Sequence, residues 1–164
     1  MNMAQKYASK LKVLAKDLEG DLYYDDTMRS LYATDASVYR EMPLAVAIPK
    51  SEEDIVKLVH FVSEIDSFLI PRSAGTSLAG QTVGAGIVVD VSQYMNKIIE
   101  VNHMQQWAHV EPGVIRDQFN HHVAPQGLFF SPITSTANRA TLGGMVGNNS
   151  SGTTSIIYLS LIHI

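Results

Sequence analysis

Apolar residues near the start of the chain recur at the three- and four-residue spacing of a helix. They are Ala4, Tyr7, Ala8, Leu11, Leu14, Ala15 and Leu18. Gly20 follows them as a helix stop. We therefore expect a first amphipathic helix whose apolar face serves packing. The stretch from Asp21 to Arg40 has no clear period, so irregular structure is expected there, with room for a short helix.

A strand, a helix and a second strand are predicted next. Ala45 to Ile48 is a short apolar run that ends at Pro49. Ser51 followed by Asp54 resembles a capping box and predicts the start of a helix. The expected buried face of that helix is Ile55, Leu58, Val59, Val62 and Ile65. Phe68 to Ile70 is the next predicted strand, and it leads directly into a glycine-containing loop.

The second half of the chain alternates short apolar runs with turn residues. The predicted strands are Ile87–Val91, Ile98–Val101 and Trp107–Val110. A helix is expected over Val114 to Val123, after the turn at Pro112. Strands alternating with helices indicate an α/β or α+β layer structure. The later strands are too close together for repeated parallel crossovers, so a mixed sheet fits best.

Composition narrows the class of protein. The 164 residues are 46% hydrophobic and 17% charged, which is typical of a folded chain. The formal net charge of −4 provides no basic surface for nucleic acid. The chain has no cysteine, which excludes disulfides and thiolate-bound metal centres within it. We see neither a signal peptide nor an apolar run long enough to span a membrane, so a cytoplasmic protein is expected.

The loop from Pro71 to Gln81 is the first candidate binding site. Glycines let its backbone approach a ligand closely, and successive backbone N–H groups in such a turn form an anion-binding nest. Hydroxyl side chains and an arginine add donors. The candidate residues are Arg72, Ser73, Ala74, Gly75, Thr76, Ser77, Gly80 and Gln81. A serine-rich surface turn remains the alternative.

A second glycine-containing loop runs from Thr141 to Gly152. Its glycines and the carboxamides of Asn148 and Asn149 suit either a pyrophosphate or the polar edge of a flavin ring. A glycine-rich packing contact is the alternative. Neither loop has the Gly-x-Gly-x-x-Gly pattern of a Rossmann fold or the Lys-Ser/Thr end of a Walker loop. Two such loops suit a cofactor as long as a dinucleotide.

The two loops resemble the phosphate-binding loop and the Gly-Gly, Gly-Asn-x-x-Gly segment of the vanillyl-alcohol oxidase/p-cresol methylhydroxylase (PCMH) class of FAD enzymes. Other segments resemble that class in the same order, over roughly Leu31 to Tyr158. They are Leu31–Ser37, Pro49–Asp54, Val89–Ser92 with Met95 and Asn96, Glu111–Val114, and Gly127–Pro132. Thr76 to Gln81 and Met95 to Ile99 look most like the FAD-linked dehydrogenases of D-lactate and related D-2-hydroxy acids.

The resemblance implies an α+β, two-lobed PCMH-type fold with mixed sheets and FAD between the lobes. It implies that the pyrophosphate lies on the Arg72–Gly80 loop and that the segment from Pro132 to Gly152 closes around diphosphate and flavin. The implied binding residues in that segment are Pro132, Thr136, Thr141, Gly143, Gly144, Gly147, Asn148, Ser151 and Gly152. Some members attach the flavin through a histidine where this chain has Thr76, so FAD is expected to bind non-covalently.

The implied reaction is oxidation of a D-2-hydroxy acid, such as D-lactate, by hydride transfer to flavin N5. The resemblance implies an electron acceptor, a quinone, a cytochrome or an electron-transfer protein, and does not choose among the three. The resemblance places the catalytic residues, and an iron–sulfur domain where one exists, after Tyr158, so no catalytic or metal-binding residue is expected in this chain. It leaves membrane association of the intact protein open. An alcohol, sugar or lactone substrate, or a non-catalytic FAD-binding module, are the alternatives.

Three segments are expected along the chain. Residues 1–40 form a helical lead-in and residues 41–158 an incomplete FAD-binding domain. Residues 159–164 resemble the translation of a transposon-derived sequencing adaptor, so we expect a C-terminally truncated fragment that is inactive by itself. A native apolar strand at residues 159–164 is the alternative.

Overall fold

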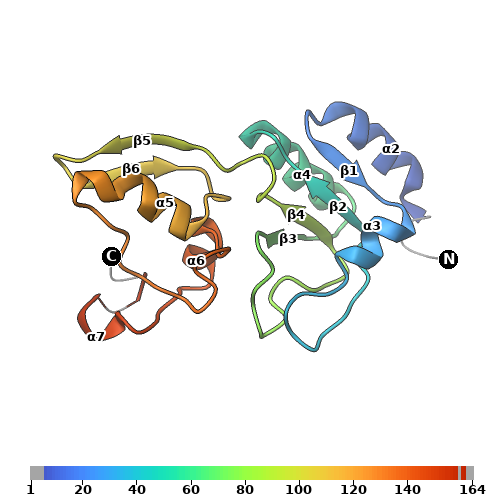
Figure 1. Cartoon of the computed structure of the whole chain (residues 1–164). Coiled ribbons are helices and arrows are strands. Elements are labelled where there is room, and N and C mark those ends of the chain that lie inside the picture. The colour runs from blue at the N-terminus through green and yellow to red at the C-terminus, as the bar shows by residue number, and fades with distance from the viewer. Residues whose placement is uncertain (1–5, 159, 162–164) are drawn as a thin grey trace. The chain divides into compact units, whose positions relative to one another are not determined.

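The structure is a computed structural model, and it describes residues 6–158 and 160–161 (Figure 1). The chain separates into two compact units, Met1–Tyr94 and Met95–Ile164. The expected domain limits at residues 40 and 158 remain a prediction. Ala4 of the first predicted helix lies outside the described residues, as do residues 159 and 162–164 of the C-terminal hexapeptide.

The first unit contains a four-stranded mixed sheet. Its elements are α2 (Ala8–Asp17), β1 (Asp21–Tyr23), α3 (Asp26–Leu31), β2 (Ala45–Ile48), α4 (Glu52–Glu64), β3 (Leu69–Arg72) and β4 (Ile87–Asp90). The strand order is β1-β2-β4-β3. Strands β2 and β3 run parallel to β4, whereas β1 pairs antiparallel with β2 (Figure 1). The expected mixed sheet and α+β class are confirmed.

The core of this unit lies between one face of the sheet and the two longest helices, α2 and α4. The sheet contributes alternate residues, as the two-residue period of a strand requires. The buried residues of this core are Leu11, Leu14, Leu18, Leu44, Ala45, Ala47, Leu58, Phe61, Val62, Ile65, Ile87 and Val89. The first predicted helix is thus confirmed, and its apolar face serves packing as expected.

Three local expectations in the first unit were wrong. On α4, Val59 is 50% exposed and Phe61 is buried in its place. Strand β3 continues to Arg72, while Phe68 lies outside it and is exposed. Asp21–Tyr23, expected to be irregular, forms β1 because its backbone pairs with β2.

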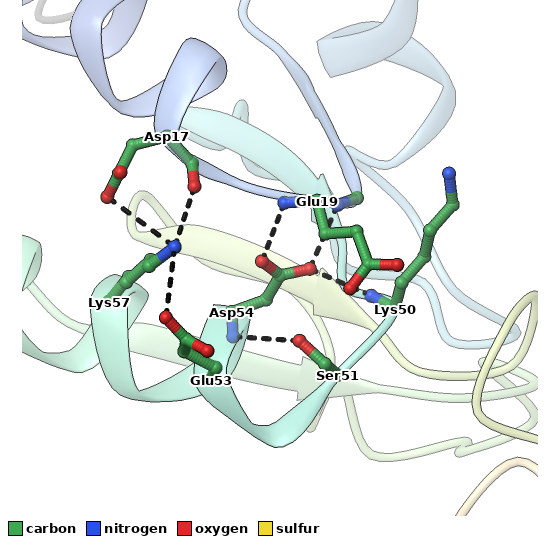
Figure 2. Close-up of polar contacts among 8 residues, drawn as sticks. Asp17, Glu19, Lys50, Ser51, Glu53, Asp54 and Lys57 are labelled. Carbon is green, nitrogen blue, oxygen red and sulfur yellow. Dashed lines mark hydrogen bonds and ion pairs between the residues drawn. The ribbon is translucent and has the colours of Figure 1, made fainter.

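Asp54 connects the start of α4 to the end of α2 (Figure 2). Ser51 caps α4 by accepting a hydrogen bond from the Asp54 N–H at 3.3 Å. The Asp54 carboxylate accepts three backbone N–H groups, from Glu19 at 2.8 Å, Gly20 at 2.9 Å and Lys50 at 3.0 Å. Only the Ser51 half of the predicted capping box is therefore present, because the acidic side chain bonds a different segment.

These bonds change the ionisation of the buried carboxylate. Burial alone would raise the pKa of Asp54, but the three N–H donors and the nearby charge of Lys57 outweigh it and lower the pKa. Lys57 also donates to the carbonyl oxygen of Asp17 at 2.7 Å (Figure 2). Both contacts hold α4 against the C-terminal end of α2.

The second unit combines a hairpin with short helices. Strands β5 (Ile98–Asn102) and β6 (Trp107–Val110) pair antiparallel. The helices are α5 (Arg116–Val123), the 3₁₀ helix η1 (Ala124–Gln126), α6 (Leu142–Gly147) and α7 (Ser155–Tyr158). The core of this unit contains Val114, Phe119, Val123 and Leu142. The predicted hairpin strands and helix are confirmed, although the helix begins at Arg116 rather than Val114.

Half of the second glycine segment, Leu142–Gly147, forms the helix α6, so the description as a loop was wrong for these residues and holds for residues 148–152. Thr141 is the N-cap of α6, and its side chain accepts a hydrogen bond from the Gly144 N–H at 3.2 Å. Three of the six helical residues are glycines, which have low helix propensity. The cap and the packing described below compensate for that low propensity.

No helix within residues 6–158 and 160–161 combines the length and the apolarity needed to cross a membrane.

Candidate cofactor-binding site

The first glycine loop leaves the carboxyl end of β3, beside the carboxyl end of the parallel strand β4. The two strands stay in register to Arg72 and Asp90, and the Val91 N–H still donates to the Arg72 carbonyl oxygen at 3.0 Å. Ligands of α/β sheets bind outside the carboxyl ends of the strands. The loop therefore begins where such a site is expected.

A segment from the first part of the chain, Tyr32 to Tyr39, packs against this loop. The Ala36 N–H donates to the Gly75 carbonyl oxygen at 3.0 Å, and Thr82 Oγ1 donates to Asp35 Oδ2 at 3.2 Å. A β-carbon added at Gly80 would lie 2.6 Å from the ring of Tyr39. The first-loop candidates are thus held together with a segment that the site prediction had left out.

The backbone of the loop presents a row of N–H groups. Gly75 and Gly80 have φ values of +63° and +70°, a left-handed conformation that favours glycine. Within the described residues, the N–H groups of residues 73–77 donate no backbone or side-chain hydrogen bond. An anion-binding nest is built from successive backbone N–H groups at a turn of this kind.

Arg72 is the last residue of β3, and its guanidinium lies over the start of the loop. Nη1 donates to the Thr34 carbonyl oxygen at 2.7 Å. The guanidinium carbon lies 5.0 Å from the centre of the Tyr32 ring, within cation–π range. A β-carbon at Gly75 would come within 2.7 Å of Nη2. The side chain is therefore fixed beside the turn that carries the free N–H groups.

The side chains of the loop fall into two groups. Ser77 Oγ donates to Gln81 Oε1 and accepts from the Ala79 N–H, so it stabilises the loop itself. The hydroxyls of Ser73 and Thr76 have no hydrogen-bond partner in the described part of the chain, which leaves them able to donate to a ligand. Ala74 between them has only its backbone to contribute.

Two ionisable groups beneath the loop have shifted pKa values. Burial, together with the hydrogen bond to Asp90, raises the pKa of Tyr32 to about 12. Burial alone would raise the pKa of Asp35, but hydrogen bonds from Ser37 and Thr82 outweigh it and lower the pKa. Both groups therefore keep one protonation state near neutral pH, which suits a structural support.

Two glycines of the second segment are explained by packing. A β-carbon at Gly143 would lie 2.5 Å from Cβ of Pro112, and one at Gly152 would lie 1.7 Å from the carbonyl oxygen of Ile133. The alternative of a glycine packing contact is thus realised at both positions. Gly147 differs, because no heavy atom lies within 4 Å of its built β-carbon.

Side chains of α5 hold the irregular segment that contains Pro132. Arg116 Nε donates to the Pro132 carbonyl oxygen at 3.1 Å, and Nη2 donates to that of Phe130 at 3.1 Å. Asn120 bonds both backbone groups of Phe130, accepting from its N–H at 2.7 Å and donating to its carbonyl oxygen at 3.2 Å. The site prediction missed Arg116 and Asn120, which position the segment through its backbone.

The remaining candidates of this unit occupy turns and helix ends. Thr136 accepts from the Ala140 N–H at 2.7 Å through its carbonyl oxygen, and Asn148 is the C-cap of α6. Ser151 is exposed in the turn that follows. Thr134, which the site prediction also missed, has a buried Oγ1 without a hydrogen-bond partner among the described residues. Buried hydroxyls of this kind call for a partner from outside the chain.

Solved structures resemble the whole of this fold. An alkyldihydroxyacetonephosphate synthase superposes with a TM-score of 0.79 at 20% identity, over 96% of this chain and 31% of that one. At that level of identity the likeness concerns the fold alone.

Relatives found by sequence comparison share a larger fraction of identical residues with this chain. A D-2-hydroxyglutarate dehydrogenase of Pantoea ananatis is 41% identical over 160 residues, which are 95% of this chain and 16% of that protein. A D-2-hydroxyglutarate dehydrogenase of Escherichia coli strain K12 is 44% identical over 142 residues, 85% of this chain and 14% of that protein. The chain thus spans about one seventh of the length of these relatives. The FAD binding domain family matches residues 43–163, and the chain belongs to that family.

Proposed function

We propose that this chain binds FAD with the diphosphate on the first glycine loop. The observation that carries the proposal is the row of N–H groups at residues 73–77, which have no acceptor in the described chain. A diphosphate supplies acceptor oxygens for such a row. The Arg72 guanidinium and the hydroxyls of Ser73 and Thr76 lie on the same loop, so the donors and the charge there fit the group.

In the second unit, we assign the FAD contacts to residues 132–152. The packing of Gly143 and Gly152 accounts for those two glycines without a ligand. Gly147, Asn148 and Ser151 are exposed, and the unpartnered hydroxyl of Thr134 joins them as a candidate donor. We keep Pro132, Thr136, Thr141 and Gly144 as further proposed FAD contacts, because each lies in or beside a turn or a helix start.

The FAD is held non-covalently in this proposal. Thr76 takes the place at which a histidine would form the covalent bond in the family members that have one, and the chain has no cysteine. A purified sample should be yellow and should release all of its flavin into the supernatant when the protein is precipitated with acid. Flavin that stays with the precipitated protein would contradict this part of the proposal.

For a whole protein containing this chain, we propose oxidation of a D-2-hydroxy acid. Bound FAD supplies a two-electron acceptor for the hydride on C2 of the substrate. The identity to two D-2-hydroxyglutarate dehydrogenases favours a D-2-hydroxy acid over an alcohol, a sugar or a lactone. The residues of this chain bind and orient the cofactor, and we propose that a quinone, a cytochrome or an electron-transfer protein reoxidises it.

A substrate panel tests this reaction. Under anaerobic conditions, D-2-hydroxyglutarate or D-lactate should bleach the flavin absorbance of the whole protein, whereas the L-enantiomers and alditols should not. Bleaching by an alditol or a sugar lactone alone would contradict the substrate class while leaving FAD binding intact.

A further inference from the structure

We propose that Tyr32 is a positioning residue that keeps the Arg72 cation available for an anionic ligand. The Tyr32 hydroxyl donates a hydrogen bond to the Asp90 carboxylate, with which Arg72 would otherwise pair. This inference rests on the proposed function, since the ligand in question is the diphosphate. It concerns a residue outside the glycine loop, on the segment that packs against it.

Arg72 and Asp90 are opposite one another at the ends of β3 and β4. Neighbouring residues of opposite charge at such positions commonly attract each other. Yet the ion pairs found among the described residues do not include these two. The two charges are separate although the backbone brings them into register.

The acceptor sites of Asp90 are taken by other donors. Tyr32 donates its hydroxyl to Oδ2 at 2.7 Å. Ser92 donates both its N–H, at 2.8 Å, and its hydroxyl, at 2.6 Å, to Oδ1. Asp90 is only 4% exposed, so these three bonds replace the water that its carboxylate would otherwise bind. Asp90 is therefore satisfied without a cation.

The contacts of Arg72 among the described residues include no ion pair. They are the Thr34 carbonyl oxygen, the face of the Tyr32 ring and the backbone of Gly75. Within residues 6–158 and 160–161, Nε and Nη2 donate no hydrogen bond. Tyr32 thus acts on both groups, since its ring lies under the guanidinium and its hydroxyl binds the carboxylate.

Removal of the Tyr32 hydroxyl should move the Arg72 guanidinium toward Asp90. In Tyr32→Phe the ring remains under Arg72, but the buried Asp90 carboxylate loses one donor. A buried carboxylate with an unfilled acceptor site is costly, and Arg72 is the cation in register with it. The guanidinium would then pair with Asp90 and leave the glycine loop with less positive charge for the diphosphate.

The test compares FAD with riboflavin, which has no phosphate, in titrations of the purified apoprotein. We expect Tyr32→Phe to weaken FAD binding about tenfold, the effect of losing one charge-assisted hydrogen bond, and to leave riboflavin binding unchanged. The double variant Tyr32→Phe/Asp90→Asn should regain most of the FAD affinity, because the amide has no charge to attract Arg72. Such a recovery would not follow from a purely structural role of Tyr32.

Tyr94→Phe is the matched control. Tyr94 also donates its hydroxyl to an aspartate, Asp21, at 3.0 Å and lies under a cation, Lys50, at 4.8 Å. Its removal should leave FAD affinity unchanged. Equal losses for FAD and riboflavin in Tyr32→Phe, no loss at all, or no recovery in the double variant would each overturn the inference. A wild-type protein without preference for FAD over riboflavin would instead contradict the proposed function, and this inference with it.

Discussion

The backbone of Gly75 lies directly against the guanidinium of Arg72, so that a β-carbon at Gly75 would come within 2.7 Å of Nη2. Gly75 also has a φ of +63°. A side chain there is excluded twice, by the left-handed backbone and by the arginine. The conformation of the turn at Gly75 and the position of the Arg72 guanidinium therefore depend on each other.

This coupling between the Gly75 turn and the Arg72 guanidinium predicts that Gly75→Ala affects both stability and FAD binding. The left-handed backbone should lower the free energy of unfolding by about 1–2 kcal/mol, and displacement of Arg72 should also weaken FAD binding. Gly127→Ala is the control, because Gly127 has a φ of +72° with no heavy atom within 4 Å of its built β-carbon. It should lose similar stability without losing FAD affinity. Urea denaturation and FAD titration separate the two effects, and equal FAD affinities would contradict the coupling.

The lowered pKa of Asp54 predicts a loss of stability in acid. An unfolded aspartate has a pKa of about 3.9, and the folded value lies below it. The unfolded chain therefore takes up the proton first as the pH falls. The contribution of Asp54 should be complete above about pH 5 and should decline below about pH 4 as the pH falls through the folded pKa.

Urea denaturation of Asp54→Asn at several pH values tests whether Asp54 causes the loss of stability in acid. The amide can accept from only one side, so one group of N–H donors would lose its partner. We expect a loss of about 2–3 kcal/mol in unfolding free energy at pH 7 and a shallower acid slope. Asp17→Asn is the control, because Asp17 is largely exposed and its contact with Lys57 is long, at 3.8 Å. An unchanged acid slope in Asp54→Asn would mean that another group causes the acid sensitivity.

The two bonds between Asn120 and Phe130 predict a local change in hydrogen exchange. Asn120→Ala should expose the Phe130 N–H to faster exchange and lower the unfolding free energy by about 1–2 kcal/mol. Asn120→Asp keeps an acceptor and should retain much of the protection. Gln118→Ala, at an exposed position of the same helix, should change neither quantity. Slow exchange at Phe130 in Asn120→Ala would show that other contacts hold this segment.

The glycines of the second segment should differ in their tolerance of a methyl group. Gly143→Ala and Gly152→Ala should lower the unfolding free energy by about 1–3 kcal/mol or more, because Pro112 and Ile133 would have to move. Gly147→Ala meets open space and should be nearly neutral in stability. Loss of FAD from a stable Gly147→Ala protein would place the cofactor at that position, whereas a destabilised Gly147→Ala would contradict the packing assignment.

The elements predicted correctly are those whose signal is local. Strand β2 is a continuous apolar run ended by a proline, and α4 begins at a serine cap. Strand β1 has only three half-buried residues and exists through its pairing with β2, which no local pattern reveals. The wrong prediction for α4, in which Val59 rather than Phe61 is buried, has a similar cause. The helical period allows either residue on the buried face, and the packing of the core determines which of them is buried.

The candidate site was predictable to a similar extent. Glycines and hydroxyls identified the first loop, but not Tyr32, Asp35 and Tyr39, which reach it only when the chain folds. Asp35 offered one local signal, because an aspartate two residues before a serine can accept the N–H of that serine, as it does at 2.8 Å. The helix α6 could not be predicted from three glycines, because its stability depends on the Thr141 cap and on contact with Pro112.

Titrations of FAD and of riboflavin into the wild-type protein and into Gly75→Glu test the claim that the first glycine loop binds the FAD diphosphate. A carboxylate at Gly75 would lie in the anion nest and repel the diphosphate. If the first loop binds the diphosphate, wild type should prefer FAD strongly, and Gly75→Glu should lose FAD while its weak riboflavin binding stays the same. Undiminished FAD binding by a folded Gly75→Glu protein would contradict the claim.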